Sequence, residues 1–390
     1  MPQFCPASLL VALGLLDIAL PAQMVSVSES FEGHPAVILV NDKIEITFLK
    51  QGSTIASIVL RDDPEKVSPL WNPMRMAREQ GRAGSFNPGM GHFVCVDGFG
   101  PASPEERAAG MPGHGEAHLQ NFELRTIVEN GIAILRMSAK LPLVQENLTR
   151  TFRLRAGENV VYVESELENS LSFDRPVNWA EHATVGSPWL ESALTVVDVS
   201  GSRSQTRPWS AAEGTGNQIQ RRLPPGQNFV WPMAPGIGGA AVDMRRTPEN
   251  PHYMDHTTTL LDPARSLEWV TAINPKRRQI IGYVFRRADY PWFQTWGNYP
   301  SSGKMARGME FATQPYDVSH RDALTMGSLF GVPVYRWLPA KSKIDTRFLM
   351  FFAPAPEGFV KVNEVRLEKG QIVVKGDGKQ IVLAAASASL

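Results

Sequence analysis

The sequence predicts an all-β fold, a large antiparallel β-sandwich with few, short helices. Runs of apolar or alternating residues, rich in Val, Ile, Thr and Phe, recur along the chain between Gly, Pro, Asn and Asp, which is typical of strands and hairpins. The 30 Pro and 32 Gly favour many turns over long helices. Because no long helical pattern separates the runs, a sandwich is favoured over a parallel α/β sheet.

Strands are expected in both halves of the chain. In the first half the strand-like runs lie at residues 35–42, 43–52, 53–63, 131–142, 159–170 and 194–201. In the second half they lie at 266–285, at 343–354 and within the tail 362–390. Residues 103–111 predict a short helix at most. Four stretches lack a strand pattern and are predicted as long loops, which are often functional: 72–92, 97–118, 201–228 and 286–309.

The N-terminal residues 1–22 predict a secretory signal peptide, and residues 24–390 a single β-sandwich domain without repeat or boundary. An apolar run from Leu9 to Leu20 precedes small residues. It is too short to span a bilayer, which needs about 20 apolar residues. A secreted or periplasmic location is therefore expected. Since no Lys or Arg precedes the run and Asp17 interrupts it, an ordinary buried segment and a cytoplasmic location stay open.

Charge and cysteine content narrow the classes of partner. The 39 basic and 39 acidic residues give a net charge of zero, and no basic run is present, so a nucleic-acid or acidic-membrane partner is not expected. Cleavage near Ala22 would leave Cys95 as the one cysteine, so no intramolecular disulfide is expected. The 43% hydrophobic content is enough for a large core instead.

Several clusters of polar or aromatic residues are candidates for chemistry. They are His114, Glu116 and His118; Glu181 and His182; Asp255 and His256; Glu310; and the aromatic group of Tyr290, Trp292, Phe293, Trp296 and Tyr299. His114 and His118 have the spacing of metal ligands on a helix, but Gly113 and Gly115 oppose a helix there. No metal site is therefore predicted, although convergence of the histidines with a carboxylate on one ion stays an alternative.

The order and spacing of these clusters carry a resemblance to a known family. The sequence has His114 followed by Gly115, then His182, then the pair Asp255-His256, then Glu310 followed by "FATQP". In this pattern, over about residues 36 to 355, the chain resembles the aldose 1-epimerases of the galactose mutarotase-like superfamily. The resemblance implies a β-supersandwich, an isomerase that needs no cofactor, and a small or oligomeric carbohydrate as its partner.

The resemblance also implies roles for single residues. Glu310 would be the base, His182 the acid, and His114 would hydrogen-bond the sugar ring or assist protonation. Asp255 would anchor sugar hydroxyls. Such a pair suits ring opening at the anomeric carbon, because a carboxylate can remove the hydroxyl proton while an imidazole, with a pKa near ~6.5, protonates the ring oxygen.

Further substrate contacts are expected at positions where the chain departs from the family pattern. His118 stands where the sugar-phosphate branch often has Arg. The Arg that usually precedes the first histidine is missing, and His92 or Asn87 would occupy its space. Trp292 and Trp296 would offer flat apolar faces to the sugar, or serve as core aromatics.

Other reactions remain compatible with the sequence. Glu310 could form a hydrolase carboxylate pair with Asp255 or with Glu181, since glycosidases use two carboxylates. The altered segment "HATVG" after Glu181 and the missing Arg are compatible with a non-catalytic carbohydrate-binding or accessory protein. A polysaccharide lyase of the same fold is a further alternative, because fold does not fix reaction.

Overall fold

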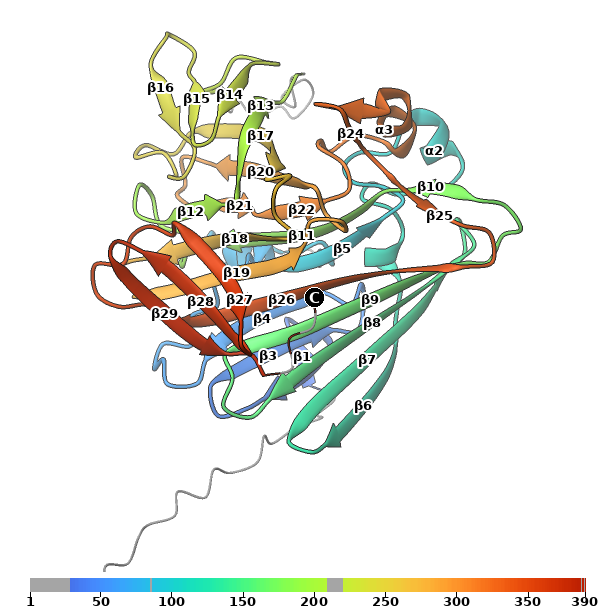
Figure 1. Ribbon diagram of the computed structural model, residues 1–390, viewed down its shortest axis with the longest axis horizontal. Coiled ribbons are helices and arrows are strands. Elements are labelled where there is room, and N and C mark those ends of the chain that lie inside the picture. Colours follow the sequence, from blue (N-terminus) through green and yellow to red (C-terminus); the bar gives the residue numbers. More distant parts are fainter. Residues whose placement is uncertain (1–28, 85, 209–219, 387, 389) are drawn as a thin grey trace, which may run out of the picture.

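The computed structural model describes residues 29–84, 86–208, 220–386, 388 and 390. The signal-peptide prediction at residues 1–22 lies outside them. Two large antiparallel sheets stack face to face, and a small third sheet covers one of them (Figure 1). The prediction of an all-β fold is confirmed.

The first sheet has 14 strands, and all of its pairings are antiparallel. Their order is β1 (Glu29–Phe31), β2 (His34–Val40), β3 (Ile44–Leu49), β4 (Ile55–Leu60), β5 (His92–Val96), β11 (Trp179–Gly186), β21 (Ala306–Gly308), β20 (Trp292–Tyr299), β17 (Tyr253–Leu261), β13 (Gly201–Thr206), β14 (Asn228–Val230), β15 (Met233–Pro235) and β16 (Ala241–Asp243). The short β22 (Glu310–Ala312) pairs with both β11 and β20.

The second sheet has eight strands and faces the first. Their order is β12 (Val196–Val199), β18 (Leu267–Asn274), β19 (Gln279–Arg286), β26 (Lys343–Pro354), β9 (Val160–Asn169), β8 (Glu146–Arg155), β7 (Ile132–Leu141) and β6 (Glu123–Glu129). The core lies between the two sheets. Phe48 of β3 and Phe152 of β8 meet there at 4.5 Å between ring centroids, and Phe311 of β22 stacks on Phe285 of β19 at 4.3 Å.

The third sheet closes the outer face of the second. It consists of β27 (Glu364–Glu368), β28 (Gln371–Gly376) and β29 (Lys379–Ala384), and it lies over β18 and β19 in Figure 1. Val365 and Ile372 share a buried apolar cluster with Ile280 and Leu349 of the second sheet. The middle strands of the second sheet therefore bury apolar side chains on both faces.

The remaining elements are short. They are α1 (Pro73–Glu79), α2 (Pro104–Ala108), the 3₁₀ helix η1 (Ala117–Leu119), α3 (His320–Met326), and the strand pairs β10 (Arg175–Val177) with β25 (Arg336–Leu338) and β23 (Ser328–Leu329) with β24 (Val332–Pro333). The expected short helix is α2, which begins at a capping box: Ser103 and Glu106 accept each other's backbone N–H groups. No helix in the described part of the chain is long and apolar enough to cross a membrane.

Two of the predicted loops contain strands, so the loop prediction was wrong there. The stretch 286–309 holds β20, which lies between Pro291 and Pro300 and is buried on both faces, so it lacks the apolar alternation of a half-exposed strand. The stretch 201–228 holds β13, whose polar side chains pair within the sheet. Its Ser204 Oγ lies 2.8 Å from Thr259 Oγ1 of β17.

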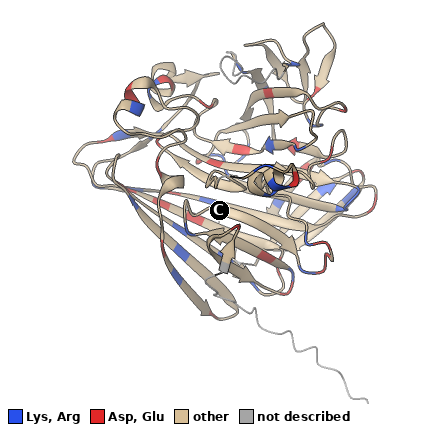
Figure 2. Cartoon of the chain, turned by 180° about the vertical axis from the view of Figure 1, so that it is seen from behind, with Lys and Arg blue, Asp and Glu red and all other residues tan. Residues whose placement is uncertain are grey.

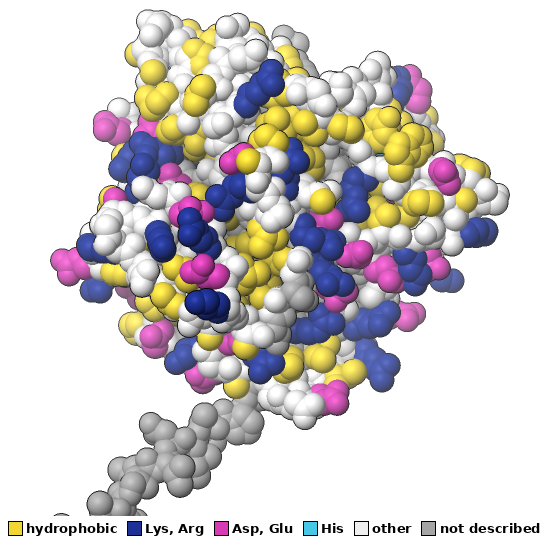
Figure 3. Space-filling view, viewed as in Figure 1, with side chains coloured by type: hydrophobic (Ala, Val, Ile, Leu, Met, Phe, Trp, Pro, Cys, Tyr) yellow, Lys and Arg dark blue, Asp and Glu magenta, His cyan; other side chains and the backbone are white. Residues whose placement is uncertain are grey.

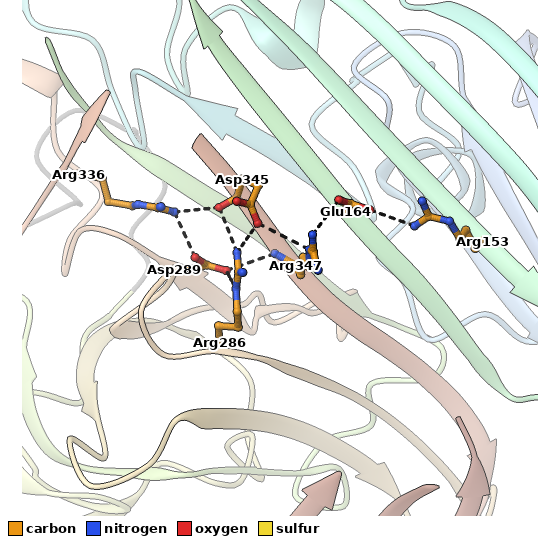
Figure 4. Close-up of polar contacts among 7 residues, drawn as sticks. All are labelled: Arg153, Glu164, Arg286, Asp289, Arg336, Asp345 and Arg347. Atoms are coloured by element: carbon orange, nitrogen blue, oxygen red, sulfur yellow. Dashed lines mark hydrogen bonds and ion pairs between the residues drawn. The ribbon is translucent and has the colours of Figure 1, made fainter. Parts of the chain in front are cut away.

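Basic and acidic residues are spread over many elements of the chain (Figure 2), and on the face shown in Figure 3 the side chains of the two signs are intermixed. One network of ion pairs crosses the strands of the second sheet (Figure 4). It contains Arg153, Glu164, Arg286, Asp289, Arg336, Asp345 and Arg347. Arg286 joins Asp289 at 2.5 Å and Asp345 at 2.7 Å. The pairs of Glu164 with Arg153 and Arg347 are partly exposed, so each is worth at most about 1 kcal/mol and mainly fixes side-chain positions across β8, β9 and β26.

Candidate functional site

A cavity of about 320 Å³ opens on the outer face of the first sheet, over β5, β11, β22, β20 and β17. Its lining residues are Trp71, Asn87, Gly89, Phe93, His114, His118, His182, His256, Trp296, Glu310 and Asp317. Of the residues given a place in the site from the sequence, six line the cavity: Asn87, His114, His118, His182, Trp296 and Glu310. Segments far apart in the sequence thus supply one site.

Strand alternation places His182 in the cavity. Along β11, successive side chains point to opposite faces, so Glu181 enters the core and His182 faces outward. Phe93 of β5 is its direct cross-strand partner, and the two rings stack at 4.4 Å and 21°. His182 Nδ1 lies 3.1 Å from Thr184 Oγ1, and Nε2 lies 3.4 Å from Glu310 Oε1. One edge of the ring is therefore held by Thr184, while Nε2 on the other edge is directed at the carboxyl group.

Gly308 makes room for the Glu310 carboxyl group. A Cβ atom at Gly308 would lie 2.0 Å from Glu310 Oε1, so no other residue fits there without moving the carboxyl group. Glu310 is 1% exposed. Burial and the nearby Asp317 raise its pKa well above the usual range, and Arg207 opposes them only in part. The group therefore holds a proton more tightly than a solvated glutamate does.

Burial has the opposite effect on the pKa of His182. Burial and the neighbouring His114 lower the pKa of His182 well below 6.5. Burial thus shifts both groups toward their neutral forms, a protonated carboxyl group beside a neutral imidazole. In that form the pair holds one proton in total.

His114 is positioned by a tight turn. His114 and Gly115 have φ values of +64° and +73°, and a Cβ atom at Gly115 would lie 1.9 Å from the Val96 carbonyl oxygen. Only glycine fits position 115 without strain and collision. The Gly100 N–H donates to His114 Nδ1 at 3.2 Å, so in the neutral ring the proton sits on Nε2. Burial and His118 lower the pKa of His114 to about 4, which makes it a neutral donor at pH 7.

His118 lies in η1, and its ring is a neighbour of the His114 ring. The ring centroids of the two histidines lie 6.2 Å apart. Burial lowers the pKa of His118 to about 4, so this ring is also neutral at pH 7. No group of three or more His, Cys, Asp or Glu side chains in the described ranges is arranged to hold a metal ion.

His256 and Asp317 form a second polar pair in the cavity. Gln294 donates its amide hydrogen to the Gln314 carbonyl at 3.2 Å, which turns its Oε1 toward His256 Nε2 at 2.9 Å. Because Nε2 donates to Gln294, the neutral ring would present a bare Nδ1 to Asp317 Oδ1, 3.2 Å away. Two acceptors repel, so the contact is favourable when Nδ1 carries a proton. Burial lowers the pKa of His256, while Asp317 raises it.

Two indole rings form an apolar border of the cavity. Trp71 and Trp296 lie edge to face, 6.0 Å apart at 69°. Trp292, predicted as a sugar contact, does not line the cavity. It lies on the same face of β20 but is fully buried, near β24, where its Nε1 donates to the Pro333 carbonyl at 3.4 Å. Of the two tryptophans predicted, the cavity includes only Trp296.

Asp255 and His92 also lie away from the cavity, because strand alternation turns them to the other face. Asp255 pairs with Arg222 at 2.5 Å, and its neighbour His256 takes the outward position on β17. His92 enters the core, where its Nε2 lies 2.9 Å from Glu181 Oε2. Of the two residues expected in the space of the missing Arg, Asn87 lines the cavity and His92 does not.

Glu181 anchors a buried polar cluster beneath the site. Arg150 donates to both of its carboxylate oxygens at 3.0 and 2.9 Å, and Trp179 Nε1 and Tyr290 Oη each lie 3.3 Å from Oε1. Burial opposes the charge of Glu181, but Arg150 and His92 lower its pKa to about 2. Glu181 is thus a fixed anion of the core. Neither Glu181 nor Asp255 shares the cavity with Glu310, which removes both hydrolase pairs considered from the sequence.

The cavity includes residues that the sequence analysis did not select as site residues. They are Trp71, Gly89, Phe93 and Asp317, together with His256, which was named in a candidate cluster but given no role. His256 is the strand neighbour of the predicted Asp255, so alternation offered it as the alternative. Asp317 follows Glu310 by seven positions in an irregular segment, and no pattern in the sequence marks it.

Comparison with known proteins identifies the fold. No protein-family model and no curated protein matches the sequence. Solved structures match most of the chain. A candidate aldose 1-epimerase from Klebsiella pneumoniae has a TM-score of 0.59 at 12% identity, over 84% of this chain and 82% of that one. A galactose mutarotase-like protein from Clostridium acetobutylicum has 0.59 at 10%, over 86% and 99%. One from Lactobacillus casei has 0.53 at 12%, over 82% and 100%.

Proposed function

We propose that this protein, whose chain has the galactose mutarotase-like fold, binds a carbohydrate in the cavity and interconverts its anomers by acid–base ring opening. The observation that carries the proposal is the contact of 3.4 Å between His182 Nε2 and Glu310 Oε1, inside a cavity with indole rings at its border. Flat apolar rings beside a few polar groups are typical of ligand sites, and they suit the mixed polar and C–H surface of a sugar.

The proposed reaction uses the single proton of this pair. Transfer of that proton from Glu310 to His182 gives a carboxylate and an imidazolium, the two forms that ring opening needs. Glu310 then takes the anomeric hydroxyl proton while His182 gives its proton to the ring oxygen, the bond from C1 to the ring oxygen breaks, and a carbonyl forms at C1. Rotation about C1–C2 and the reverse steps yield the other anomer. His114 Nε2–H would donate to the sugar.

A protein that only binds carbohydrate is the second candidate. The features of the sequence that favour it are the missing arginine and the altered segment that begins at His182, and Asn87, one of the two residues expected in the space of that arginine, lines the cavity. The buried carboxyl–imidazole contact is the observation against it, because a site for binding alone gains nothing from a glutamate whose pKa burial raises.

Replacement of the base tests the proposal. Glu310→Gln is expected to lower the rate of anomer exchange at least about 100-fold, the usual range for loss of an acid–base group, while the sugar still binds. Exchange is measured by magnetisation transfer between anomeric protons in NMR, with a panel of monosaccharides, and binding by calorimetry. Glu123→Gln, on the exposed face of β6, is the matched control. If no sugar exchanges faster than in buffer, or if Glu310→Gln exchanges at the wild-type rate, the proposal fails.

A further inference from the structure

A second pocket adjoins the cavity and shares a wall with it. The pocket has a volume of about 440 Å³ and is lined by Trp71, Pro73, Met76, Gln80, Arg82, Asn298, Pro300, Ser302 and Lys304. Trp71 lines both spaces. The proposed reaction uses no residue of the second pocket except this shared indole.

Strand β20 runs from one space into the other along a single face. Gln294 holds His256 at the inner end, Trp296 lines the cavity, and Asn298 lines the second pocket. These residues are two positions apart, so they share a face and follow one another at about 6.7 Å. One continuous polar and aromatic track therefore connects the two spaces.

The shared wall is rigid. Trp71 N–H donates to the Thr184 carbonyl at 2.9 Å, and the Trp71 carbonyl accepts from Gly91 at 2.8 Å. The Trp71 side chain lies against Gly186 of β11, where an added Cβ would come within 2.8 Å of the indole. Trp71 is thus fixed by backbone on both sides and offers a preformed surface at the junction.

The chemistry of the second pocket suits hydroxyl groups. Gln80, Asn298 and Ser302 supply amide and hydroxyl groups, while Arg82 and Lys304 supply charged donors. Pro73, Met76 and Pro300 add apolar surface. Lys304 also pairs with Glu79 beside the pocket, which leaves the site only weakly cationic. Donors and acceptors over an apolar base match a second sugar unit.

We propose that this pocket is a second sugar subsite, so that the substrate is an oligosaccharide. Its reducing-end unit occupies the cavity, its next unit passes Trp71, and the hydroxyls of that unit bind to Asn298, Ser302 and Lys304. The placement of the reducing end rests on the proposed function, while binding of two linked units does not require turnover.

The test compares sugars of one and two units on the full chain carrying Glu310→Gln, which blocks the proposed turnover. Calorimetry measures glucose, galactose, mannose and xylose against cellobiose, maltose, lactose, mannobiose and xylobiose. At least one disaccharide is expected to bind about tenfold more tightly than its monosaccharide. Adding Asn298→Ala, Ser302→Ala or Lys304→Ala is expected to remove most of that gain and leave monosaccharide affinity unchanged. Lys43→Ala, in an exposed turn, is the matched control.

The possible results separate the two proposals. If no disaccharide binds more tightly than its monosaccharide, or if the three pocket variants leave the gain intact, the second subsite is wrong even where the wild-type protein exchanges anomers. If disaccharides bind more tightly and depend on the pocket residues but no sugar exchanges, the subsite stands and the epimerase proposal falls. If no sugar in the panel binds and the wild-type protein exchanges none of them, both are overturned.

Discussion

At the scale of single residues, the contact between Glu310 and His182 determines how the proposed activity depends on pH. The pair is active with one proton. Below the lowered pKa of His182 a second proton binds and the base is lost; above the raised pKa of Glu310 the proton leaves and the acid is lost. We expect a bell-shaped profile of kcat/KM for anomer exchange whose acid limb lies well below pH 6.5, the ordinary value for histidine. An acid limb at or above that value would contradict the buried environment of His182.

Asp317 gives a second prediction at this scale, because its charge helps to raise the pKa of Glu310. Asp317→Asn removes that charge and is expected to move the alkaline limb of the profile to lower pH. The profile is measured as for the wild type, with Asp62→Asn on the exposed surface as control. An unchanged alkaline limb would show that the limb does not belong to Glu310.

Three of the residues predicted for the site lie together in the fold, and a fourth, Asp255, does not. His114, His182 and Glu310 were predicted to act together, and the fold brings all three to one cavity. Asp255 was predicted to contact the substrate, but its neighbour His256 lines the cavity instead. Both faces of β17 are buried, so no polar–apolar alternation in the sequence indicates which of the two neighbours points outward.

At the scale of elements, the turn at Gly115 allows a test with a matched control. Gly115 and Gly131 have the same φ of +73°, but a Cβ at Gly115 would meet the Val96 carbonyl at 1.9 Å, whereas Gly131 has open space. Gly131→Ala is expected to lower the free energy of unfolding by about 1–2 kcal/mol, the cost of the left-handed conformation. Gly115→Ala adds a collision with the Val96 carbonyl oxygen, and should lower the free energy of unfolding by about 1–3 kcal/mol more. Chemical denaturation measures both. Equal losses would mean that the turn relaxes.

The strands also show what the sequence can indicate. Strand β7 alternates half-buried or exposed residues with buried ones from Ile132 to Met137, and it falls within the predicted run 131–142. Strand β20 is packed on one face by the core and covered on the other by the cavity and by β24, and it carries aromatic and polar residues throughout. The order of its aromatic and polar residues therefore reflects their contacts with the core, the cavity and β24, and it has no simple period.

At the scale of the whole molecule, the third sheet bears on the prediction that residues 24–390 form one domain. Ile372 of β28 is fully buried in the cluster shared with the second sheet, whereas Val382 of β29 is 46% exposed. Ile372→Asp buries a charge and is expected to cost several kcal/mol, while Val382→Asp should cost less than about 0.5 kcal/mol. Calorimetry is expected to show one transition for the whole chain, moved down by Ile372→Asp. A separate early transition, with the main one unmoved, would make the third sheet an independent unit.

The position of β6 at the end of the second sheet has a consequence for solubility. Among the described residues no strand pairs with its outer edge, and Leu124, Ile127 and Val128 are exposed on it. An edge of this kind can pair with the same strand of another molecule and seed aggregation. Glu123, Arg125 and Glu129 lie among these apolar residues and oppose such pairing through their charge and hydration. The charged residues of β6 therefore oppose aggregation through this strand.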